Sequence, residues 1–385
     1  MRHIIYISTT MEEIDFKEYI QHWKIALNPS NQNFHNKMIR SLAINNKVDV
    51  ISVRPFSRSL CDLKKLEKED KLDGNITWHY IKVDRNPFGK IINGTSQVKK
   101  LVKTLATPDT IVICDTINPA VVHFAKNSVK HNPLIGVCTD SPSNISGTSR
   151  SYTNYLLKSA SSYSGTISLT NELNDLFNPS GKPSLIIEGI VEDRPRLKTI
   201  HSKKPYFFFG GALMKRYGIY ELIDAFNEIN KIYPDKHLYI AGHHGNYDEL
   251  KVRINSNEHI HLLGILPVED VLAYEKDAIA NINPRPFSED LDRYSIPSKT
   301  LEYLVSKVPT ISVKNTKLNK LFQEDIVWAK SGSKDDLKTA MLAVINQLPE
   351  EKTLFANRAY QKVMEYYSLE SVNAKLNAFF DTISK

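Results

Sequence analysis

Short apolar runs alternate with amphipathic stretches along the whole chain, and this alternation predicts the fold class. The runs are rich in Ile, Val, Phe and Tyr, and the stretches between them have helical period, as in NFHNKMIRSLA from Asn33 and INPAVVHFAKNSV from Ile117. Nearly continuous apolar strands that alternate with helices predict an α/β protein whose parallel sheets are covered on both faces. The expected strands are IIYIS from Ile4, VDVISV from Val48, ITWHYIKV from Ile76, TIVICDT from Thr110, LIGVCTD from Leu134, TISLT from Thr166, SLIIEGI from Ser184, YFFFGGAL from Tyr206, HLYIAG from His237, IHLLG from Ile260, AIANINP from Ala278, VPTISV from Val308 and DIVWA from Asp325.

The alternation also predicts two domains. A chain of 385 residues is long enough for two hydrophobic cores. The segment from Val191 to Pro205 is polar and basic, contains two prolines and has no apolar period, which is typical of a linker. We therefore expect two doubly wound, Rossmann-like domains, at residues 1–190 and 206–365, that face each other across a cleft and bind ligands at the carboxyl ends of strands. The charged run DLKKLEKEDKLDGN from Asp62 is expected to be a solvated helix and turn.

Composition narrows the class of partner. The net charge of +7 suits an acidic partner such as a nucleotide diphosphate, an anionic lipid or a nucleic acid, but the charge is spread along the chain and does not single out nucleic acid. The three cysteines, Cys61, Cys114 and Cys138, lack metal-ligand spacing, so buried, reduced thiols in a cytoplasmic protein are expected. No apolar run approaches the roughly 20 residues of a membrane span, and the first strand is too short for a signal-peptide core.

The most informative segment runs from Asn283 to Ser312. It is predicted to contain a buried strand, a polar loop, a short helix that begins at Pro297 or Ser298, and a second buried strand. Lys299 lies in the first turn of that helix, where a cation is unfavourable unless an anion lies in front of it. Glu302 follows one turn deeper on the same face, where its carboxylate would accept hydrogen bonds from a ribose. A nucleotide site and a solvated Lys–Glu pair both remain open on this evidence.

A second candidate phosphate site follows the strand at Tyr206. Gly210 and Gly211 allow a tight turn and a close backbone approach to a ligand, and Lys215 and Arg216 stand just before an amphipathic helix. An ordinary strand–turn–helix with surface cations is the alternative. Neither a G-x-G-x-x-G motif after a strand nor a P-loop is present, which excludes two familiar phosphate motifs.

The order of these motifs resembles a known family. FGGALMKRYGIYELIDAF, LYIAGHHG, IHLLGILPVEDVLAYEKDA and NPRP...YSIPSKTLEYLVSKVPTIS together resemble the C-terminal half of the group one glycosyltransferases, above all the branch that builds bacterial surface polysaccharides. The likeness is good over about residues 205–330 and weaker in the first half. It implies a GT-B fold and retaining transfer from a nucleotide sugar. Residues 1–190 would bind the acceptor, 191–205 would link the domains, 206–365 would bind the nucleotide sugar, and a helix at 366–385 would return to the N-terminal domain.

The resemblance also implies roles for particular residues. Glu302 matches the second glutamate of the family's E-x7-E motif, which binds the ribose. Ser298, Lys299 and Thr300 match the segment that contacts the diphosphate. The residues that match the base-reading segment and the glycine after the second strand of that domain are Gly264, Ile265, Leu266 and Gly242.

Three positions depart from the family pattern. The first glutamate of the motif is replaced by Tyr294, a frequent arginine by Gly211, and a usual lysine by Tyr217. We expect Lys215 and Arg216, together with Arg285 of the NPRP turn, to take over phosphate binding.

The expected chemistry needs positive charge where the bond to the nucleotide breaks. Arg216 and Lys299 would stabilise the charge that develops on the β-phosphate, without a metal or other cofactor. Asp140 follows the strand LIGVCTD and would orient or deprotonate an acceptor hydroxyl; a cap on its own turn is an equal alternative. Asp290 and Asp292 spell the D-x-D metal motif of another glycosyltransferase fold, but we interpret them as part of a solvated loop. The helix predicted from Asn33 to Leu42 would contact the acceptor or, as we favour, pack.

Two functions from different classes follow. The first is a hexosyltransferase that takes its sugar from a nucleotide sugar, with UDP-sugar the expected donor, and delivers it to a saccharide or polyprenyl-linked acceptor in polysaccharide synthesis. The second is a catalytically silent GT-B homologue that acts as a partner or chaperone of an active transferase, motivated by the three departures. We expect a cytoplasmic protein with peripheral contact to the inner face of the membrane and no nucleic-acid partner, although no strong basic amphipathic helix is evident.

Overall fold

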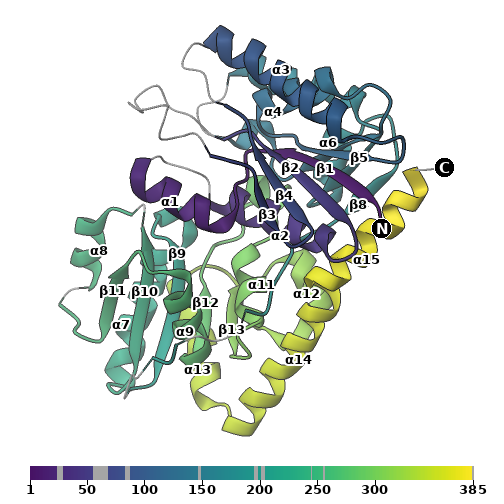
Figure 1. The fold of residues 1–385 in the computed structure, drawn as a ribbon. Coiled ribbons are helices and arrows are strands. Elements are labelled where there is room, and N and C mark those ends of the chain that lie inside the picture. The colour runs from purple at the N-terminus through teal and green to yellow at the C-terminus, as the bar shows by residue number, and fades with distance from the viewer. Residues whose placement is uncertain are drawn as a thin grey trace. The chain divides into compact units, whose positions relative to one another are not determined.

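Two parallel sheets organise the chain into two structural units (Figure 1). The structure is a computed structural model and describes residues 1–23, 29–54, 68–82, 87–145, 149–194, 198–200, 204–243, 245–254 and 256–383. The first unit comprises Met1–Ile190, Arg293–Ser295 and Leu369–Lys385, and the second comprises Val191–Asp292 and Ile296–Ser368. Cys61 and parts of the 191–205 segment lie outside the described residues.

The first unit is built on an eight-stranded sheet with strand order β3-β4-β2-β1-β5-β6-β7-β8. Neighbouring strands are parallel except β3 and β4, which pair in antiparallel fashion at one edge. The strands are β1 (His3–Ser8), β2 (Lys47–Ser52), β3 (Lys71–Asp73), β4 (Ile76–Tyr80), β5 (Ile111–Asp115), β6 (Leu134–Cys138), β7 (Gly165–Ser168) and β8 (Ser184–Ile186).

Helices cover both faces of this sheet because both faces are apolar. Successive side chains of a strand point to opposite faces. Ile4 and Tyr6 of β1 pack in a cluster with residues of α2 and α15, whereas Ile5 and Ile7 pack in a cluster with residues of α3 and α4. The helices of this unit are α1 (Glu13–Trp23), α2 (Pro29–Ala43), α3 (Pro87–Leu105), α4 (Pro119–Ser128), α5 (Arg150–Ser159), α6 (Asn171–Phe177) and α15 (Leu369–Ile383).

The second unit is built on a six-stranded parallel sheet with strand order β11-β10-β9-β12-β13-β14. The direction in which strands are added reverses between β9 and β12, which is the topological switch point where doubly wound folds bind ligands. The strands are β9 (Tyr206–Ala212), β10 (His237–His243), β11 (Ile260–Gly264), β12 (Ala280–Asn283), β13 (Thr310–Val313) and β14 (Val327–Ala329).

The helices of the second unit carry its apolar stripes toward the sheet. Leu222, Ile223 and Phe226 of α7 are fully buried against strand residues such as Phe207 and Ile240. Burial of a side chain of this size contributes about 1.5–3 kcal/mol. The helices are α7 (Ile219–Ile232), α8 (Tyr247–Ile254), α9 (Val268–Asp277), α10 (Glu289–Asp292), α11 (Ser298–Leu304), α12 (Thr316–Phe322), α13 (Lys334–Asn346) and α14 (Pro349–Tyr367).

The predicted fold class is confirmed, with one element missed. Every run expected to be a strand contributes one, and the helical patterns from Asn33 and Ile117 fall in α2 and α4. The charged run from Asp62 was interpreted wrongly where it is described, because Lys71–Asp73 forms strand β3. Its residues Lys71, Leu72 and Asp73 form no apolar run, so only pairing with β4 reveals the strand. Cys114 and Cys138 are buried free thiols, as predicted.

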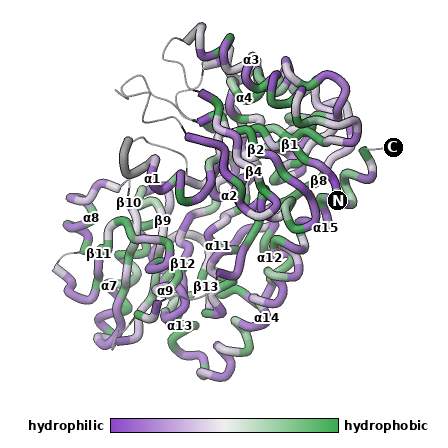
Figure 2. The backbone as a smooth tube through the Cα atoms, viewed as in Figure 1, coloured by the Kyte–Doolittle hydropathy of each residue, from purple (hydrophilic) through white to green (hydrophobic). Residues whose placement is uncertain are grey.

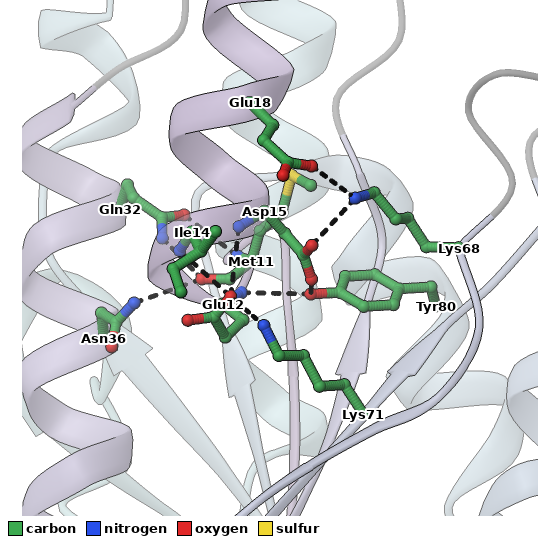
Figure 3. A network of polar contacts seen from close by, with 10 residues as sticks. All are labelled: Met11, Glu12, Ile14, Asp15, Glu18, Gln32, Asn36, Lys68, Lys71 and Tyr80. Carbon is green, nitrogen blue, oxygen red and sulfur yellow. Dashed lines mark hydrogen bonds and ion pairs between the residues drawn. The ribbon is translucent and has the colours of Figure 1, made fainter.

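A polar network fixes the start of α1 in the first unit (Figure 3). The Glu12 carboxylate accepts hydrogen bonds from the Ile14 and Asp15 amides at 3.0 and 3.1 Å, which satisfies donors that a helix start leaves open. Asp15 accepts a hydrogen bond from the Tyr80 hydroxyl at 2.6 Å and pairs with Lys68 at 2.9 Å. These contacts hold α1 against β4 through partly buried charges.

Candidate active site

The carboxyl ends of the strands in the second unit bring most of the predicted donor residues together. Gly211 of β9 pairs with Gly242 of β10, and Gly264 of β11 pairs with Ala241. Gly242 has a φ of +146°, and a Cβ at that position would lie 1.7 Å from the Gly211 carbonyl oxygen. Gly242 is therefore required for the close approach of these two strands.

The turn after β9 presents two cations at the start of a long helix. Lys215 and Arg216 lie in the 3₁₀ turn Lys215–Tyr217, are exposed, and have no ion pair among the residues that the structure describes. The Arg216 guanidinium lies over the Tyr217 ring, 5.0 Å from its centroid. Gly218 then begins α7 without a side-chain cap. The amides of this helix start and the two cations form a positive surface suited to an anion.

Gly218 ties this turn to strand β12. Its φ is +77°, and a Cβ there would lie 2.1 Å from the Pro284 carbonyl oxygen, just beyond β12. Both the left-handed backbone and the lack of space require glycine. The β9 turn and the β12 turn therefore meet at the topological switch point of this sheet.

Helix α11 presents Lys299 and Glu302 together on its surface. The Lys299 ammonium lies 3.4 Å from a Glu302 carboxylate oxygen, and the two side chains are 42% and 30% exposed. Ser298, in the same first turn, is exposed. Burial lowers the pKa of Lys299, but the charges of Glu302 and Glu275 outweigh this effect and raise that pKa above its usual value. Lys299 therefore stays protonated at neutral pH, as a phosphate-binding lysine must.

Thr300 does not face the surface with Lys299. Its side chain is fully buried, and its hydroxyl accepts a hydrogen bond from the Asn283 amide at 2.9 Å and lies 3.0 Å from the Ser312 hydroxyl. These bonds of the hydroxyl join α11 to β12 and β13, so the expected contact of Thr300 with the diphosphate stays a prediction for its backbone. One step along a helix turns a side chain by about 100°, which separates Thr300 from Lys299.

The backbone of Gly210 makes hydrogen bonds inside the second unit. Its amide donates a hydrogen bond to the Tyr303 hydroxyl at 2.9 Å, and that hydroxyl is 3.2 Å from the Gly210 carbonyl oxygen. Burial raises the pKa of Tyr303, so its hydroxyl remains a neutral partner for both backbone groups. The backbone of Gly210 is therefore closed to a ligand, while Gly211 is half-buried. Sequence reasoning missed Tyr303, although it directly follows Glu302.

Arg285 lines a small open hollow at the ends of β12 and β13. The hollow is also lined by Phe287, Lys314 and Asn315. The Arg285 guanidinium donates to the Asp292 carboxylate at 3.0 Å. A phosphate at this arginine would share it with that carboxylate, which weakens the expectation that Arg285 binds the donor.

Asp292 does not belong to a solvated loop. It lies in the short helix α10, is 7% exposed, and accepts hydrogen bonds from the Ser288 amide at 2.8 Å and the Asn315 side chain at 3.2 Å in addition to Arg285. The solvated-loop interpretation of the D-x-D sequence is therefore wrong at this residue. The carboxylate stabilises the turn around Arg285.

The remaining predicted donor residues, Ile265 and Leu266, follow the edge strand β11 of the same sheet. Ile265 is 73% exposed, and Leu266 packs in the cluster around Tyr206. Tyr294, at the position of the missing glutamate, belongs to Arg293–Ser295 of the first unit and packs against its core. Its ring takes a packing role at a position where the family has a carboxylate.

Asp140 lies at the carboxyl end of β6 in the first unit. It is half-buried, and its carboxylate accepts a hydrogen bond from the Ser141 amide at 2.8 Å. This bond is the turn cap that we weighed against an acceptor role, and it leaves the second carboxylate oxygen for other partners. Burial raises the pKa of Asp140, and the Ser141 amide opposes that rise.

Asp115, at the end of β5, was not singled out from the sequence. It is fully buried, accepts a hydrogen bond from the Ile117 amide at 2.9 Å, and lies 3.7 Å from Nε2 of the equally buried His35. The other ring nitrogen of His35 is 2.6 Å from the Tyr6 hydroxyl. His35 therefore packs inside the unit, as we favoured for its helix.

Two further searches concern only the residues that the structure describes. No group of three His, Cys, Asp or Glu side chains among them is arranged to hold a metal ion. No described helix combines the length and apolar character that a membrane crossing requires.

The residues of the second unit that form the candidate site match a known protein family. The family model of glycosyl transferases group 1 matches residues 204–347, which include the β9 turn and helix α11. Residues 204–347 therefore carry a group 1 glycosyltransferase domain, which supports the assignment of the chain as a glycosyltransferase. No curated protein sequence matches the chain.

Solved structures show that the glycosyltransferase has the GT-B fold over its whole length. Sucrose-phosphate synthase from Thermosynechococcus elongatus is 9% identical, with a TM-score of 0.72 and coverage of 100% of this chain and 99% of that chain. Trehalose 6-phosphate synthase from Burkholderia multivorans is 11% identical, with a TM-score of 0.66 and coverage of 100% and 98%. TarM is 12% identical, with a TM-score of 0.66 and 99% coverage of both chains. At these identities the likeness shows the fold alone.

Proposed function

We propose that this glycosyltransferase moves a hexose-type sugar from a nucleotide sugar to a saccharide or lipid-linked acceptor, with retention of anomeric configuration, in the synthesis of a bacterial cell-envelope polysaccharide or glycoconjugate. The observation that carries the proposal is the pairing of two features at one sheet edge. The cationic turn of Lys215 and Arg216 precedes α7, and the Lys299–Glu302 pair lies on α11. Both belong to the segment that matches the family.

The two features suit the two polar parts of a nucleotide. The cations and the uncapped start of α7 offer positive charge to a diphosphate. Glu302, one turn below Lys299, offers a carboxylate to ribose hydroxyls. When the bond from the sugar to the diphosphate breaks, negative charge grows on the leaving phosphate. Arg216 and Lys299 stabilise that charge most strongly in a closed, dry site.

The acceptor side of the reaction belongs to the first unit. Asp140 is the residue that we assign to orient the acceptor hydroxyl and to accept its proton. Its raised pKa brings the carboxylate closer to the pH at which it works. The Ser141 amide donates a hydrogen bond to one oxygen of the Asp140 carboxylate. This bond fixes the orientation of the carboxylate and therefore the position of its second oxygen.

Two similar structures support the choice of donor and the stereochemistry. A structure of an S. aureus TarM variant is a complex with Fondaparinux, alpha-GlcNAc-glycerol and UDP; it is 17% identical, with a TM-score of 0.56 and coverage of 75% of this chain and 59% of that chain. A structure of trehalose-6-phosphate synthase concerns enzymatic glycosyltransfer with retention. We therefore propose UDP-sugar as the donor class. Because Arg216 and Lys299 supply positive charge, we expect turnover to persist in EDTA.

Thermal unfolding with UDP, GDP, ADP and CMP tests the proposal. A nucleotide at 100 times its dissociation constant stabilises the folded protein by roughly 2.7 kcal/mol, which raises the midpoint by about 2–4 °C per kcal/mol. We expect UDP to raise the midpoint and the other three nucleotides to leave it unchanged. A shift with a different nucleotide reassigns the donor. If none shifts the midpoint, the protein is a silent partner of another transferase.

A further inference from the structure

The sheet of the second unit splits between β9 and β12. Strand β10 pairs with β9 along its whole length, whereas β12 pairs with β9 at Phe207 and Phe208. The Tyr206 carbonyl lies on the β12 side of the strand, where it accepts a hydrogen bond from the Ile279 amide at 2.8 Å. Alternate residues of a strand direct their backbone groups to the same side. Gly210 therefore directs its amide and carbonyl to the side where pairing with β12 has already ended.

The Tyr303 hydroxyl takes the place of the missing strand partner. It accepts a hydrogen bond from the Gly210 amide at 2.9 Å and lies 3.2 Å from the Gly210 carbonyl oxygen, to which it donates. Both residues are buried, and buried backbone groups require partners. A phenol hydroxyl can meet both needs because it donates and accepts at the same time. Tyr303 thus satisfies the backbone at the residue where the sheet opens.

This contact joins the two cationic parts of the candidate donor site. Gly210 precedes the turn that presents Lys215 and Arg216, and Tyr303 lies on α11, four residues after Lys299. Residues at this spacing lie next to each other on a helix. Accordingly, the Lys299 charge lowers the pKa of Tyr303 against the larger effect of burial. Figure 2 shows hydrophilic and hydrophobic positions alternating along α11, as expected of a helix with one side in the core.

We propose that Tyr303 is a positioning residue of the donor site. Its hydroxyl sets the spacing between the β9 turn and α11, so that Arg216 and Lys299 approach the same diphosphate. Hydrogen bonds from cations to phosphate depend on distance and direction. A misplacement of about 1 Å caused by a remote change can cost about 100-fold in rate. The inference rests on the proposed function and deepens it, because it assigns a residue that acts on the nucleotide through others.

Tyr206 offers a matched control in the same unit. It is also buried, and its hydroxyl donates a hydrogen bond to the Tyr274 carbonyl at 3.0 Å. It begins β9, four residues before Gly210, which places it about 13 Å along the strand from the opening of the sheet. Tyr206→Phe therefore removes a buried tyrosine hydrogen bond without changing the carboxyl edge.

Calorimetric titration with UDP and UMP tests the inference. Tyr303→Phe keeps the ring and removes the hydroxyl, so we expect UDP binding to weaken roughly 10-fold. UMP lacks the β-phosphate, so its affinity should change by less than about twofold. Tyr206→Phe should lower the urea midpoint of unfolding, as Tyr303→Phe does, but should bind both nucleotides like the parent protein. 4-Aminophenylalanine at position 303, whose amino group donates and accepts, should restore UDP binding.

Amide exchange in the parent protein provides a second test that needs no variant. If Tyr303 fixes the turn before the nucleotide arrives, the Gly210 amide should exchange slowly in the free protein. Fast exchange that slows only when UDP is added would show that the ligand orders the turn, and this result would overturn the inference.

The outcomes separate this inference from the proposed function. An unchanged UDP affinity in Tyr303→Phe, or equal losses for UDP and UMP, would overturn the positioning role while the parent protein still binds UDP. A loss of UDP affinity of the same size in Tyr206→Phe would also overturn it, because that result indicates a general effect on stability. A parent protein that binds no UDP would overturn the proposed donor and this inference together.

Discussion

The carboxyl edges of the two sheets present different candidate side chains. In the second unit that edge presents Lys215, Arg216 and Lys299. In the first unit it presents the carboxylates Asp115 and Asp140, at the ends of β5 and β6. A doubly wound sheet therefore positions ligands at this edge, and the residues that follow each strand decide which ligand fits. A cationic edge suits a diphosphate, and an edge with a carboxylate suits a hydroxyl that must lose a proton.

The two edges also differ in how their charges are held. Asp115 is fully buried and is fixed by the Ile117 amide, so its charge serves the interior of the unit. Lys215 and Arg216 are exposed and have no ion pair in the described part of the chain. Charges that await a ligand stay in water until it arrives, because burying them alone would cost several kcal/mol. The exposed cations and the half-buried Asp140 are therefore the groups to test.

Asp140→Asn should produce the largest effect. The asparagine keeps an oxygen for the Ser141 amide, so the turn survives, but it cannot accept a proton. We expect kcat to fall roughly 100-fold or more, with an unchanged UDP-induced thermal shift. Asp109→Asn, at an exposed position, is the control. An unchanged kcat would show that Asp140 only caps its turn and would remove the proposed contrast between the edges.

Lys299→Ala tests the cationic edge. A charge-assisted hydrogen bond to a phosphate contributes about 1.5–3 kcal/mol, so we expect UDP affinity to fall roughly 10- to 100-fold in a titration by calorimetry. Lys231→Ala, an exposed lysine at the far end of α7, should bind UDP like the parent protein. Equal affinity in the Lys299 variant would reduce the Lys299–Glu302 contact to a surface ion pair.

Thr300→Val should separate stability from binding. The valine leaves the Asn283 amide without its buried acceptor, at a cost of about 1–3 kcal/mol in the free energy of unfolding. Because Thr300 faces the interior, UDP affinity should stay unchanged once the protein is folded. Urea unfolding and calorimetry measure the two quantities. The reverse outcome, weaker UDP binding with unaltered stability, would return Thr300 to the diphosphate site.

The smallest expected effect is a pH-dependent change in stability from Asp49, a carboxylate within strand β2 rather than at the carboxyl edge of the sheet. Asp49 of β2 accepts hydrogen bonds from His3 at 2.7 Å and His79 at 2.8 Å. Burial raises the pKa of Asp49, but these bonds lower it overall; burial lowers the pKa of His79, but Asp49 and Asp70 raise it overall. The lowered pKa of Asp49 stabilises the folded state at pH values above about 4, the pKa of an aspartate in the unfolded chain. The raised pKa of His79 stabilises the folded state at pH values below about 6.5, the pKa of a histidine in the unfolded chain.

Stability of the first unit should therefore be greatest between about pH 4 and 6.5. It should fall as the pH drops through the folded pKa of Asp49 or rises through that of His79. His79→Gln should remove the loss on the alkaline side, with a change on the order of 1 kcal/mol in urea unfolding. A pH profile identical to that of the parent protein would contradict the assignment.

Much of the fold follows from local patterns. Nearly continuous apolar runs such as those of β1, β5 and β9 need cover on both faces, so strand positions and the α/β class are predictable. Strand β3 was missed because its three residues, two of them charged, form no apolar run and are ordered by pairing with β4. The Rossmann strand order of the second unit also agrees with the predicted doubly wound class.

The candidate site could be predicted only in part. Lys299 and Glu302 follow from helical spacing, which places residues three apart on one face. The same spacing does not show that Tyr303 reaches the backbone of Gly210, or that Asp292 gathers Arg285, Ser288 and Asn315. The contacts of Tyr303 with Gly210 and of Asp292 with Asn315 join residues that are distant in the chain, and residue type does not specify the partners of any of these side chains.

The sequence by itself determined the elements of this protein, the glycines and cations that follow its strands, and its excess of positive charge. Those properties arise from periodicity, backbone freedom and side-chain chemistry, which are local. Only the tertiary structure decided that Thr300 faces inward while Lys299 faces outward, and that the lysines of α3, α4 and α5 share one face. The direction in which a side chain points, and the distance between side chains of different helices, depend on how elements far apart in the chain pack. Packing selects which side of each helix is buried.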